Sequence, residues 1–313
     1  MLPINENFGS LNMALPKAAY ALSQLDGIEL YHDDYGLRHP LGAYNISLSS
    51  IGKRVSRVVE VVNELQTESW NPGKASPRNE ALLEATDHLL DAAMEHLDVC
   101  HSILKCFFKP DEERGRKLAY QLLKKEIEPY RNHIGSVDNY IKHKQGALRL
   151  IQFVWPGGRC LGYFVEGNLG EGMLGPAREI HKDSNSAFSF NRDVRFYVCS
   201  VFAVGARLAS VLHSIDKRIV PRYKTTENYL KANDWINSLK LVSGLPYTFF
   251  HDEVSIGIPE IRLSKERLIV TVPGDRRKVS IPPNGSRISL VYIGDGVTRG
   301  FKLPYWGHVG VRS

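Results

Sequence analysis

The clearest pattern in the chain is a stripe of apolar residues that follows Ser76-Pro77. From Leu83 to Phe107, apolar residues recur every three or four positions, with Thr86 the one polar member of the stripe. This is the period of one helix face, and a serine followed by a proline is a typical helix start. The pattern therefore predicts a long helix that ends at Pro110.

A second stripe with the same spacing runs from Tyr120 to Ile151. Pro129 lies inside it and predicts a kink or a break. With a short turn near residues 111–114, the two stripes predict an antiparallel helical hairpin, most naturally part of a bundle. A shorter stripe covers residues 55–65, whereas the residues up to about 48 show no long period.

The hydrophobic period changes after residue 151. Residues 152–155 and 160–166 look extended and flank Pro156-Gly157-Gly158, which predicts a hairpin. Two further helices are expected, a buried one over residues 192–218 and another over 226–239. From residue 256 onward, short apolar runs alternate with turn residues, which predicts a β-meander.

These patterns predict an α+β fold, in which a long antiparallel helical hairpin or bundle is followed by a C-terminal antiparallel β-rich region. We expect four regions along the chain. They are an N-terminal mixed segment (1–50), a helical bundle region (51–151), a region with a glycine-rich hairpin and buried helices (152–250) and a basic β-rich region (251–313).

Composition places the chain among ordinary globular proteins. Of its 313 residues, 43% are hydrophobic and 24% are charged, which excludes disordered and collagen-like classes for the bulk of the chain. Four cysteines without C-x-x-C or zinc spacing predict buried free thiols; they are Cys100, Cys106, Cys160 and Cys199. There is no secretory signal and no apolar run of membrane length free of charges, so we expect a soluble, cytoplasmic protein without membrane contact.

The excess positive charge lies near the C-terminus. Residues 261–313 carry ten Lys or Arg residues against three acidic ones, within a net charge of +6 for the whole chain. This asymmetry indicates an anionic partner, and the alternative is a solvated surface of turns. The residues expected to contact nucleic acid are Arg276, Arg277, Lys278, Arg287, Arg299 and Lys302.

Two short motifs in the sequence also have simpler interpretations. Residues 170–175 have the G-x-G-x-x-G spacing, but a dinucleotide site also needs a helix at the last glycine, and the apolar pattern ends by Asp183. We therefore expect a glycine loop and no nucleotide cofactor. Glu179, His181 and Asp183 would share one face of an extended segment, either as a metal site or as a solvated polar edge; we expect no metal.

The most suggestive polar residues are Arg131, His133, Asn139 and His143. At 100° per residue, Asn139 and His143 share the polar helix face, whereas Arg131 and His133 flank the apolar stripe. Histidine, arginine and asparagine together can hold a phosphate and move a proton, so these four are the candidate catalytic residues. The alternative is a polar helix face with histidines at the edge of the core.

A helical bundle with an Arg-Asn-His cluster on a late helix resembles the HEPN domains of prokaryotes, many of which are RNases of toxin and antiphage systems. Arg131-Asn132 matches the start of their motif, in which a histidine follows the arginine by four to six residues. His133 comes too early and His143 too late, while Arg207 and His213 have a suitable gap but no asparagine after the arginine. The resemblance covers residues 77–151.

The resemblance and the basic C-terminus together predict a nucleic-acid-associated protein, in its enzymatic form an RNase-like component of an antiphage or toxin-type system. Walker A, G-x-S-x-G and H-E-x-x-H signatures are absent from the sequence, which lowers the support for common NTPases, hydrolases and zinc proteases. The alternative is a non-catalytic interaction or assembly subunit, whose long helical seam would bind a protein partner or a second copy of the chain.

Overall fold

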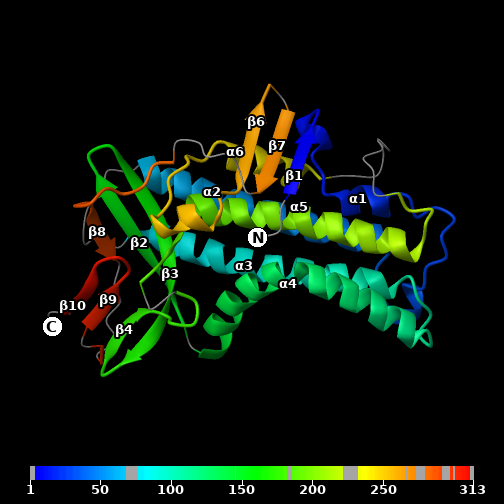
Figure 1. Ribbon diagram of the computed structural model, residues 1–313, viewed down its shortest axis with the longest axis horizontal. Coiled ribbons are helices and arrows are strands. Elements are labelled where there is room, and N and C mark those ends of the chain that lie inside the picture. The colour runs from blue at the N-terminus through cyan, green and yellow to red at the C-terminus, as the bar shows by residue number, and fades with distance from the viewer. Residues whose placement is uncertain are drawn as a thin grey trace.

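The computed structural model describes residues 4–67, 76–144, 146–181, 185–220, 232–265, 267–272, 279–290, 297–298 and 300–310. Four long helices form its body, and sheets lie at one end and along one side (Figure 1). The helices are α1 (Lys17–Leu22), α2 (Pro40–Thr67), α3 (Pro77–Lys105), α4 (Glu113–Lys144), α5 (Phe190–Ile215) and α6 (Asn233–Ser243). The α+β class predicted from the sequence is confirmed.

The predicted helical hairpin is formed by α3 and α4. Ser76 caps α3 by accepting a hydrogen bond from the backbone N–H of Arg78, as the Ser-Pro start predicted. The seam residues Leu90, Leu97, Ile127 and Ile134 are all at most 2% exposed, and they pack in the main core of the chain. The seam is thus closed within one chain.

Helices α2 and α4 differ from the sequence-based expectation at their ends. Helix α2 begins at Pro40, because its stripe of Tyr44, Leu48 and Ile51 continues the one seen from Val55 onward. Helix α4 passes through Pro129 without a break, and its axis bends along its length (Figure 1). It ends at Lys144, so residues 148–151 belong to strand β2 and not to the helix.

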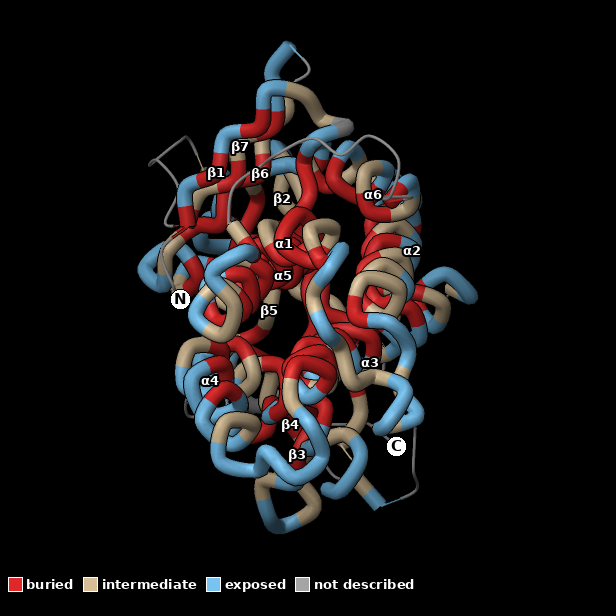
Figure 2. Tube along the Cα trace, turned by 90° about the vertical axis from the view of Figure 1, so that its right-hand side faces the viewer, coloured by how far each residue is buried: buried red, intermediate tan, exposed pale blue. Residues whose placement is uncertain are grey.

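Helix α5 is the central element, and most of its residues are buried between α1, α4 and the sheets (Figure 2). Within the described part of the chain it is also the one helix long and apolar enough to cross a membrane. Burial inside the fold accounts for that composition. The four cysteines are buried free thiols, as predicted.

Two sheets contain the strands. A three-stranded antiparallel sheet has the order β1-β7-β6, and a larger one has the order β10-β9-β4-β3-β2-β8, with β5 beside β3. All pairs in the larger sheet are antiparallel except β4 and β9. The strands are β1 (Ile4–Phe8), β2 (Leu148–Trp155), β3 (Gly158–Gly170), β4 (Met173–Pro176), β5 (Phe188–Ser189), β6 (Glu260–Ser264), β7 (Arg267–Val272), β8 (Arg287–Leu290), β9 (Gly300–Leu303) and β10 (Gly307–Gly310).

The hairpin predicted around Pro156 is formed by β2 and β3, whereas the C-terminal strands do not form one meander. Strand β7 pairs with the N-terminal β1 on one side and with β6 on the other, while β8 joins β2 and β9 joins β4. Turn residues predict where strands end but not which strand lies beside them, so the long-range pairings could not be read from this segment. The G-x-G-x-x-G stretch is the β3–β4 hairpin turn, with φ of +94° at Gly170 and +75° at Gly172.

Candidate functional site

The structure does not bring the four predicted catalytic residues together. Arg131 faces α3, where its Nη2 lies 3.6 Å from Oδ1 of Asp98. His133 faces the opposite way, towards α5, because two residues rotate a helix by about 200°. Asn139 and His143 are exposed on the outer face of α4.

The second HEPN-like pair is engaged elsewhere. Arg207 forms an ion pair with Glu126, with 3.3 Å between Nε and Oε2. Nδ1 of His213 lies 2.6 Å from the carbonyl oxygen of Ile219, to which it can donate a hydrogen bond. Neither residue reaches Arg131 or His133 through these contacts.

The predicted basic patch is only partly within the described residues. Arg276, Arg277, Lys278 and Arg299 lie outside them. Arg287 is exposed on β8, and Lys302 is half-buried on β9. These two residues do not lie on neighbouring strands, because β2, β3 and β4 lie between β8 and β9 in the sheet order.

The acidic and histidine cluster after the glycine loop also differs from expectation. Asp183 lies outside the described residues, and Glu179 is exposed. His181 is fully buried, and its Nε2 accepts a hydrogen bond of 2.9 Å from the backbone N–H of Val165. Burial, with His133 nearby, lowers the pKa of His181 to about 3, so it is a neutral core histidine. No group of three or more potential metal ligands occurs among the described side chains.

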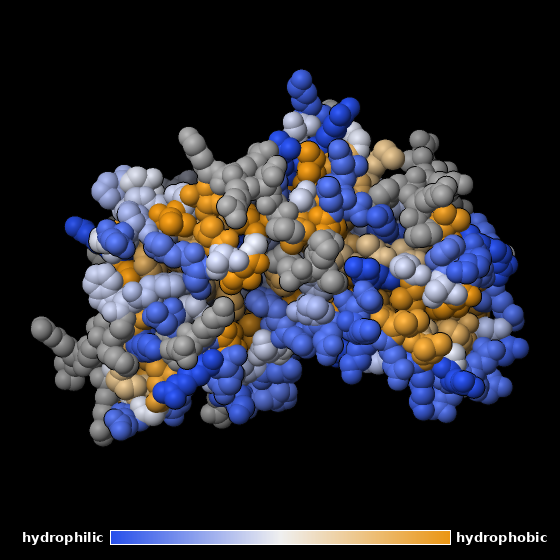
Figure 3. Space-filling view, in the orientation of Figure 1, coloured by the Kyte–Doolittle hydropathy of each residue, from blue (hydrophilic) through white to orange (hydrophobic). Residues whose placement is uncertain are grey.

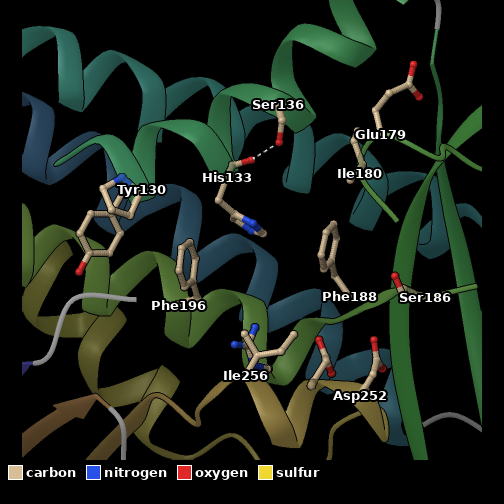
Figure 4. Close-up of a pocket in the computed structure, with 14 residues that line it drawn as sticks. Tyr130, His133, Ser136, Glu179, Ile180, Ser186, Phe188, Phe196, Asp252 and Ile256 are labelled. Carbon is tan, nitrogen blue, oxygen red and sulfur yellow. Dashed lines mark hydrogen bonds between the residues drawn. The ribbon is translucent and has the colours of Figure 1, made fainter. Parts of the chain in front are cut away.

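His133 lies in a cavity of about 310 Å³. This volume is near the lower end of the roughly 300–1,000 Å³ that is typical of small-molecule sites. The walls come from α4, from the turn after β4, from β5 and the first turns of α5, and from the 3₁₀ helix Asp252–Ile256. His133 points into the space between Phe188 and Phe196, and Asp252 and Ile256 lie opposite it (Figure 4).

Aromatic contacts fix the position of the His133 ring. Its centroid is 4.6 Å from that of Phe196 and 5.3 Å from that of Phe188, both in edge-to-face geometry. Its carbonyl oxygen accepts a hydrogen bond from the hydroxyl of Ser136. These contacts hold the ring in place. The imidazole is 28% exposed, so it remains open to the cavity.

A buried carboxylate lies behind the imidazole. Oδ1 of Asp193 is 3.6 Å from Nε2 of His133, which is a charge contact rather than a hydrogen bond. The Tyr163 hydroxyl donates a hydrogen bond of 2.5 Å to the other oxygen, Oδ2. Burial, and then the negative charge of Asp193, raise the pKa of the hydroxyls of Tyr163 and Tyr197 well above the ordinary range. Both tyrosines therefore stay protonated beside the carboxylate.

A second buried carboxyl group lies at the far side of the cavity. Oε1 of Glu253 accepts a hydrogen bond from the backbone N–H of Ser189, and Oε2 accepts one from Phe250, both at 2.9 Å. Burial raises the pKa of Glu253 to about 7, although Arg192 and the two N–H groups act to lower it. Arg192 itself donates to the carbonyl of Gly257 at 3.1 Å.

Sequence reasoning missed Arg192, Asp193, Asp252 and Glu253. Of the residues at this site it singled out His133 and Glu179, in two separate candidate groups. One signal was present in the sequence. Arg192 and Asp193 begin a stretch predicted to be a buried helix, and buried charges need partners or a function. Asp252 and Glu253 carried no such signal, because they precede the last strands in a segment without a clear period.

No family model, curated protein or solved structure matches the chain. The resemblance to HEPN domains therefore stays a prediction, and the function has to be argued from the cavity.

Proposed function

We propose that the cavity binds one nucleotide of a single-stranded RNA, and that His133 transfers a proton when the strand is cleaved. The observation that carries this proposal is the His133–Asp193 pair: a partly exposed imidazole that opens into a cavity, with a buried carboxylate directly behind it. An imidazole this close to a carboxylate can donate a hydrogen bond to it in the substrate complex, because catalytic hydrogen bonds are often long before the substrate binds. Such a histidine serves as a general base or acid near neutral pH.

The proposed reaction uses the 2′-hydroxyl of RNA as the nucleophile. His133 takes the proton of this hydroxyl, the oxygen bonds to phosphorus, and the bond from phosphorus to the 5′-oxygen breaks. The departing 5′-oxygen takes a proton from water, and His133 returns its own proton to the solvent.

The aromatic walls support a nucleotide as the ligand. Proteins that bind single-stranded nucleic acid commonly stack bases on aromatic side chains. Phe188 and Phe196 stand on two sides of the space below His133 (Figure 4). A flat ring fits between such walls better than a branched aliphatic group does.

A cleavage assay with a matched histidine control tests the proposal. A fluorescent RNA oligonucleotide is incubated with the wild type, with His133→Ala and with His143→Ala, which removes an exposed histidine of the same helix. We expect His133→Ala to lose about 10²-fold or more of the rate, the usual contribution of a general acid or base, and His143→Ala to keep it. The DNA oligonucleotide of the same sequence should stay intact.

Two outcomes would refute the assignment. One is the absence of cleavage by the folded wild type. The other is equal activity in the wild type and His133→Ala, since the rate would then not depend on the imidazole in the cavity. The antiphage or toxin-type setting and the cytoplasmic location follow from the sequence alone and stay predictions.

The basic C-terminal residues are a second proposed contact with nucleic acid. Phosphate contacts release counterions, so binding should weaken steeply with salt and depend little on sequence. Replacing Arg276, Arg277 and Lys278 by glutamate should weaken the binding of labelled RNA at low salt and flatten its salt dependence. Unchanged binding would assign these residues to a solvated surface.

A different observation favours the alternative of a non-catalytic interaction subunit. Leu118 and Leu122, one turn apart on α4, are 59% and 44% exposed. On the face shown in Figure 3, hydrophobic residues form several patches that hydrophilic side chains separate. Because the α3–α4 seam is filled within the chain, a partner would have to contact this outer face instead. A stable complex lost in Leu118→Ser/Leu122→Ser, in a protein without RNase activity, would support this function.

A further inference from the structure

The polar groups opposite His133 suit the edge of a base better than they suit a phosphate. Asp252 and Glu253 line this part of the cavity with Arg192. Two acidic residues repel a phosphate, whereas carboxylate oxygens accept hydrogen bonds from the N–H groups of a base. The nucleotide would therefore place its base among these groups and its sugar and phosphate nearer the mouth.

Asp252 has one carboxylate oxygen to spare. Its Oδ1 accepts a hydrogen bond of 2.6 Å from the Tyr305 hydroxyl. No hydrogen bond joins its Oδ2 to any residue that the structure describes. Glu253 differs, because backbone N–H groups occupy both of its oxygens. Asp252 is thus the carboxylate that can accept from a ligand.

Arg192 brings an unused donor to the same cavity. The residue is 5% exposed, and its Nη2 donates to the carbonyl of Gly257. Its Nε is buried and has no hydrogen-bond partner among the described residues. A buried N–H without a partner costs free energy, and a ligand acceptor at this point would remove that cost.

We infer that the cavity is selective for guanine. Asp252 accepts from the N1–H at Oδ2 and from the 2-amino group at the lone pair of Oδ1 that Tyr305 leaves free, and Arg192 donates to O6. Guanine alone among the four RNA bases presents two adjacent donors beside an acceptor on one edge. Arginine paired with the acceptors of guanine is the commonest specific contact to that base. Phe188 and Phe196 would hold the two faces of the ring. This inference rests on the proposed function, because it takes the ligand to be a nucleotide.

Equilibrium binding of free mononucleotides tests the inference without any need for cleavage. Calorimetric titration of the full chain with GMP, AMP, CMP and UMP should show a preference for GMP of about tenfold or more, the discrimination that a good bidentate pair provides. Inosine monophosphate lacks only the 2-amino group, so it should bind about tenfold more weakly than GMP.

Asp252→Asn is the decisive variant. Asparagine keeps an oxygen for Tyr305 but turns an NH₂ group towards the base, so the distinction between GMP and inosine monophosphate should disappear. Glu179→Gln is the matched control: it removes a carboxylate of the same cavity wall whose oxygens point away from the space between the two phenylalanines (Figure 4). This variant should keep the preference. Thermal unfolding of each variant shows that it is folded.

The outcomes separate this inference from the proposed function. Equal binding of all four mononucleotides, no binding of any, or an Asp252→Asn variant with unchanged preference would each overturn the guanine site. Selective binding of GMP by a protein that does not cleave RNA would support the guanine site and refute the RNase. Cleavage of RNA without preference for guanosine would support the RNase and refute the guanine site.

Discussion

Glu253→Gln should change how the stability of the protein depends on pH. Burial raises the pKa of Glu253 from its ordinary value of 4.5 to about 7 in the folded state. Between these two values the folded protein holds a proton that the unfolded chain releases. Stability therefore falls as pH rises through this window and is constant with respect to this group above it. A shift of this size corresponds to about 3 kcal/mol of unfolding free energy.

Three buried histidines act in the opposite direction. Burial lowers the pKa of His96 and His101 to about 4 and that of His181 to about 3. Their neutral forms stabilise the fold above pH 6.5, and this stability is lost as pH falls towards their folded pKa values. The wild-type curve is the sum of both effects, so Glu253 is isolated only by subtracting the curve of Glu253→Gln.

The substitution also has a constant cost. Glutamine keeps one acceptor oxygen but turns an NH₂ group towards a backbone N–H, either that of Ser189 or that of Phe250. Leaving that donor unsatisfied costs about 1–3 kcal/mol, independent of pH. The variant should therefore be the less stable protein at pH 4.5. Because the wild type loses about 3 kcal/mol as pH rises and the variant does not, the variant should be equally stable or more stable at pH 8.

Urea unfolding at constant ionic strength, from pH 4.5 to pH 8, measures the difference. The midpoint and the slope of each transition show whether both proteins unfold in the same way. Glu179→Gln, at an exposed position, controls for the loss of one negative charge. The reasoning would be refuted if the unfolding free energy of the wild type minus that of Glu253→Gln stayed constant with pH or increased as pH rises.

Two packing predictions need only thermal or urea unfolding. Leu97→Ala should cost about 3–5 kcal/mol, since Leu97 is 2% exposed in the helical seam, whereas Leu118→Ala at a 59% exposed position should cost less than about 1 kcal/mol. Gly162→Ala should destabilise by more than about 2 kcal/mol, because its Cβ would lie 2.4 Å from the carbonyl oxygen of Phe188; Gly42→Ala, with no atom within 4 Å, should not. Equal midpoints within either pair would contradict the packing described.

The helices could be predicted because the residues that specify each of them are close together in the sequence. The stripe from Leu83 to Phe107 and the Ser76-Pro77 start lie in one continuous segment, and the structure follows both. The start of α2 was missed since glycine, serine and asparagine interrupt its first turns between Pro40 and Ser50. Strands β2 and β3 were predicted in place, whereas β1 was not predicted. It pairs with β7 across more than 250 residues, and no local pattern specifies such a partner.

The site was harder to predict than the fold because its residues come from four distant segments. Sequence reasoning grouped Arg131 with His133, which are neighbours in sequence but lie on opposite sides of one helix. It could not join His133 to Asp193 or Asp252, which follow it by 60 and 119 positions. Only the packing of α4 against α5 and the 3₁₀ helix Asp252–Ile256 brings them to one cavity.

Three charged residues, Arg192, Asp193 and Arg195, are buried in the first turns of α5, and their contacts differ. Arg195 is fully buried and does not line the cavity; its terminal nitrogens donate to the carbonyls of Asn191, Leu245 and Pro246, and its guanidinium lies 4.3 Å from the centre of the Tyr247 ring. These contacts hold α5 against the segment after α6, although Nε of Arg195 has no hydrogen-bond partner among the described residues.

Arg192 and Asp193 also keep hydrogen-bonding atoms without a partner. Nε of Arg192 and Oδ1 of Asp193 are buried without a hydrogen-bond partner among the described residues. Arg192 lines the cavity, and Asp193 lies beside His133, which also lines it. Burying such groups is costly unless something compensates for the lost hydration. A bound base near Arg192, and a protonated imidazole beside Asp193 during proton transfer, would each supply that compensation. The proposed chemistry would thus give partners to two buried groups that the packing of the described residues leaves without a hydrogen bond.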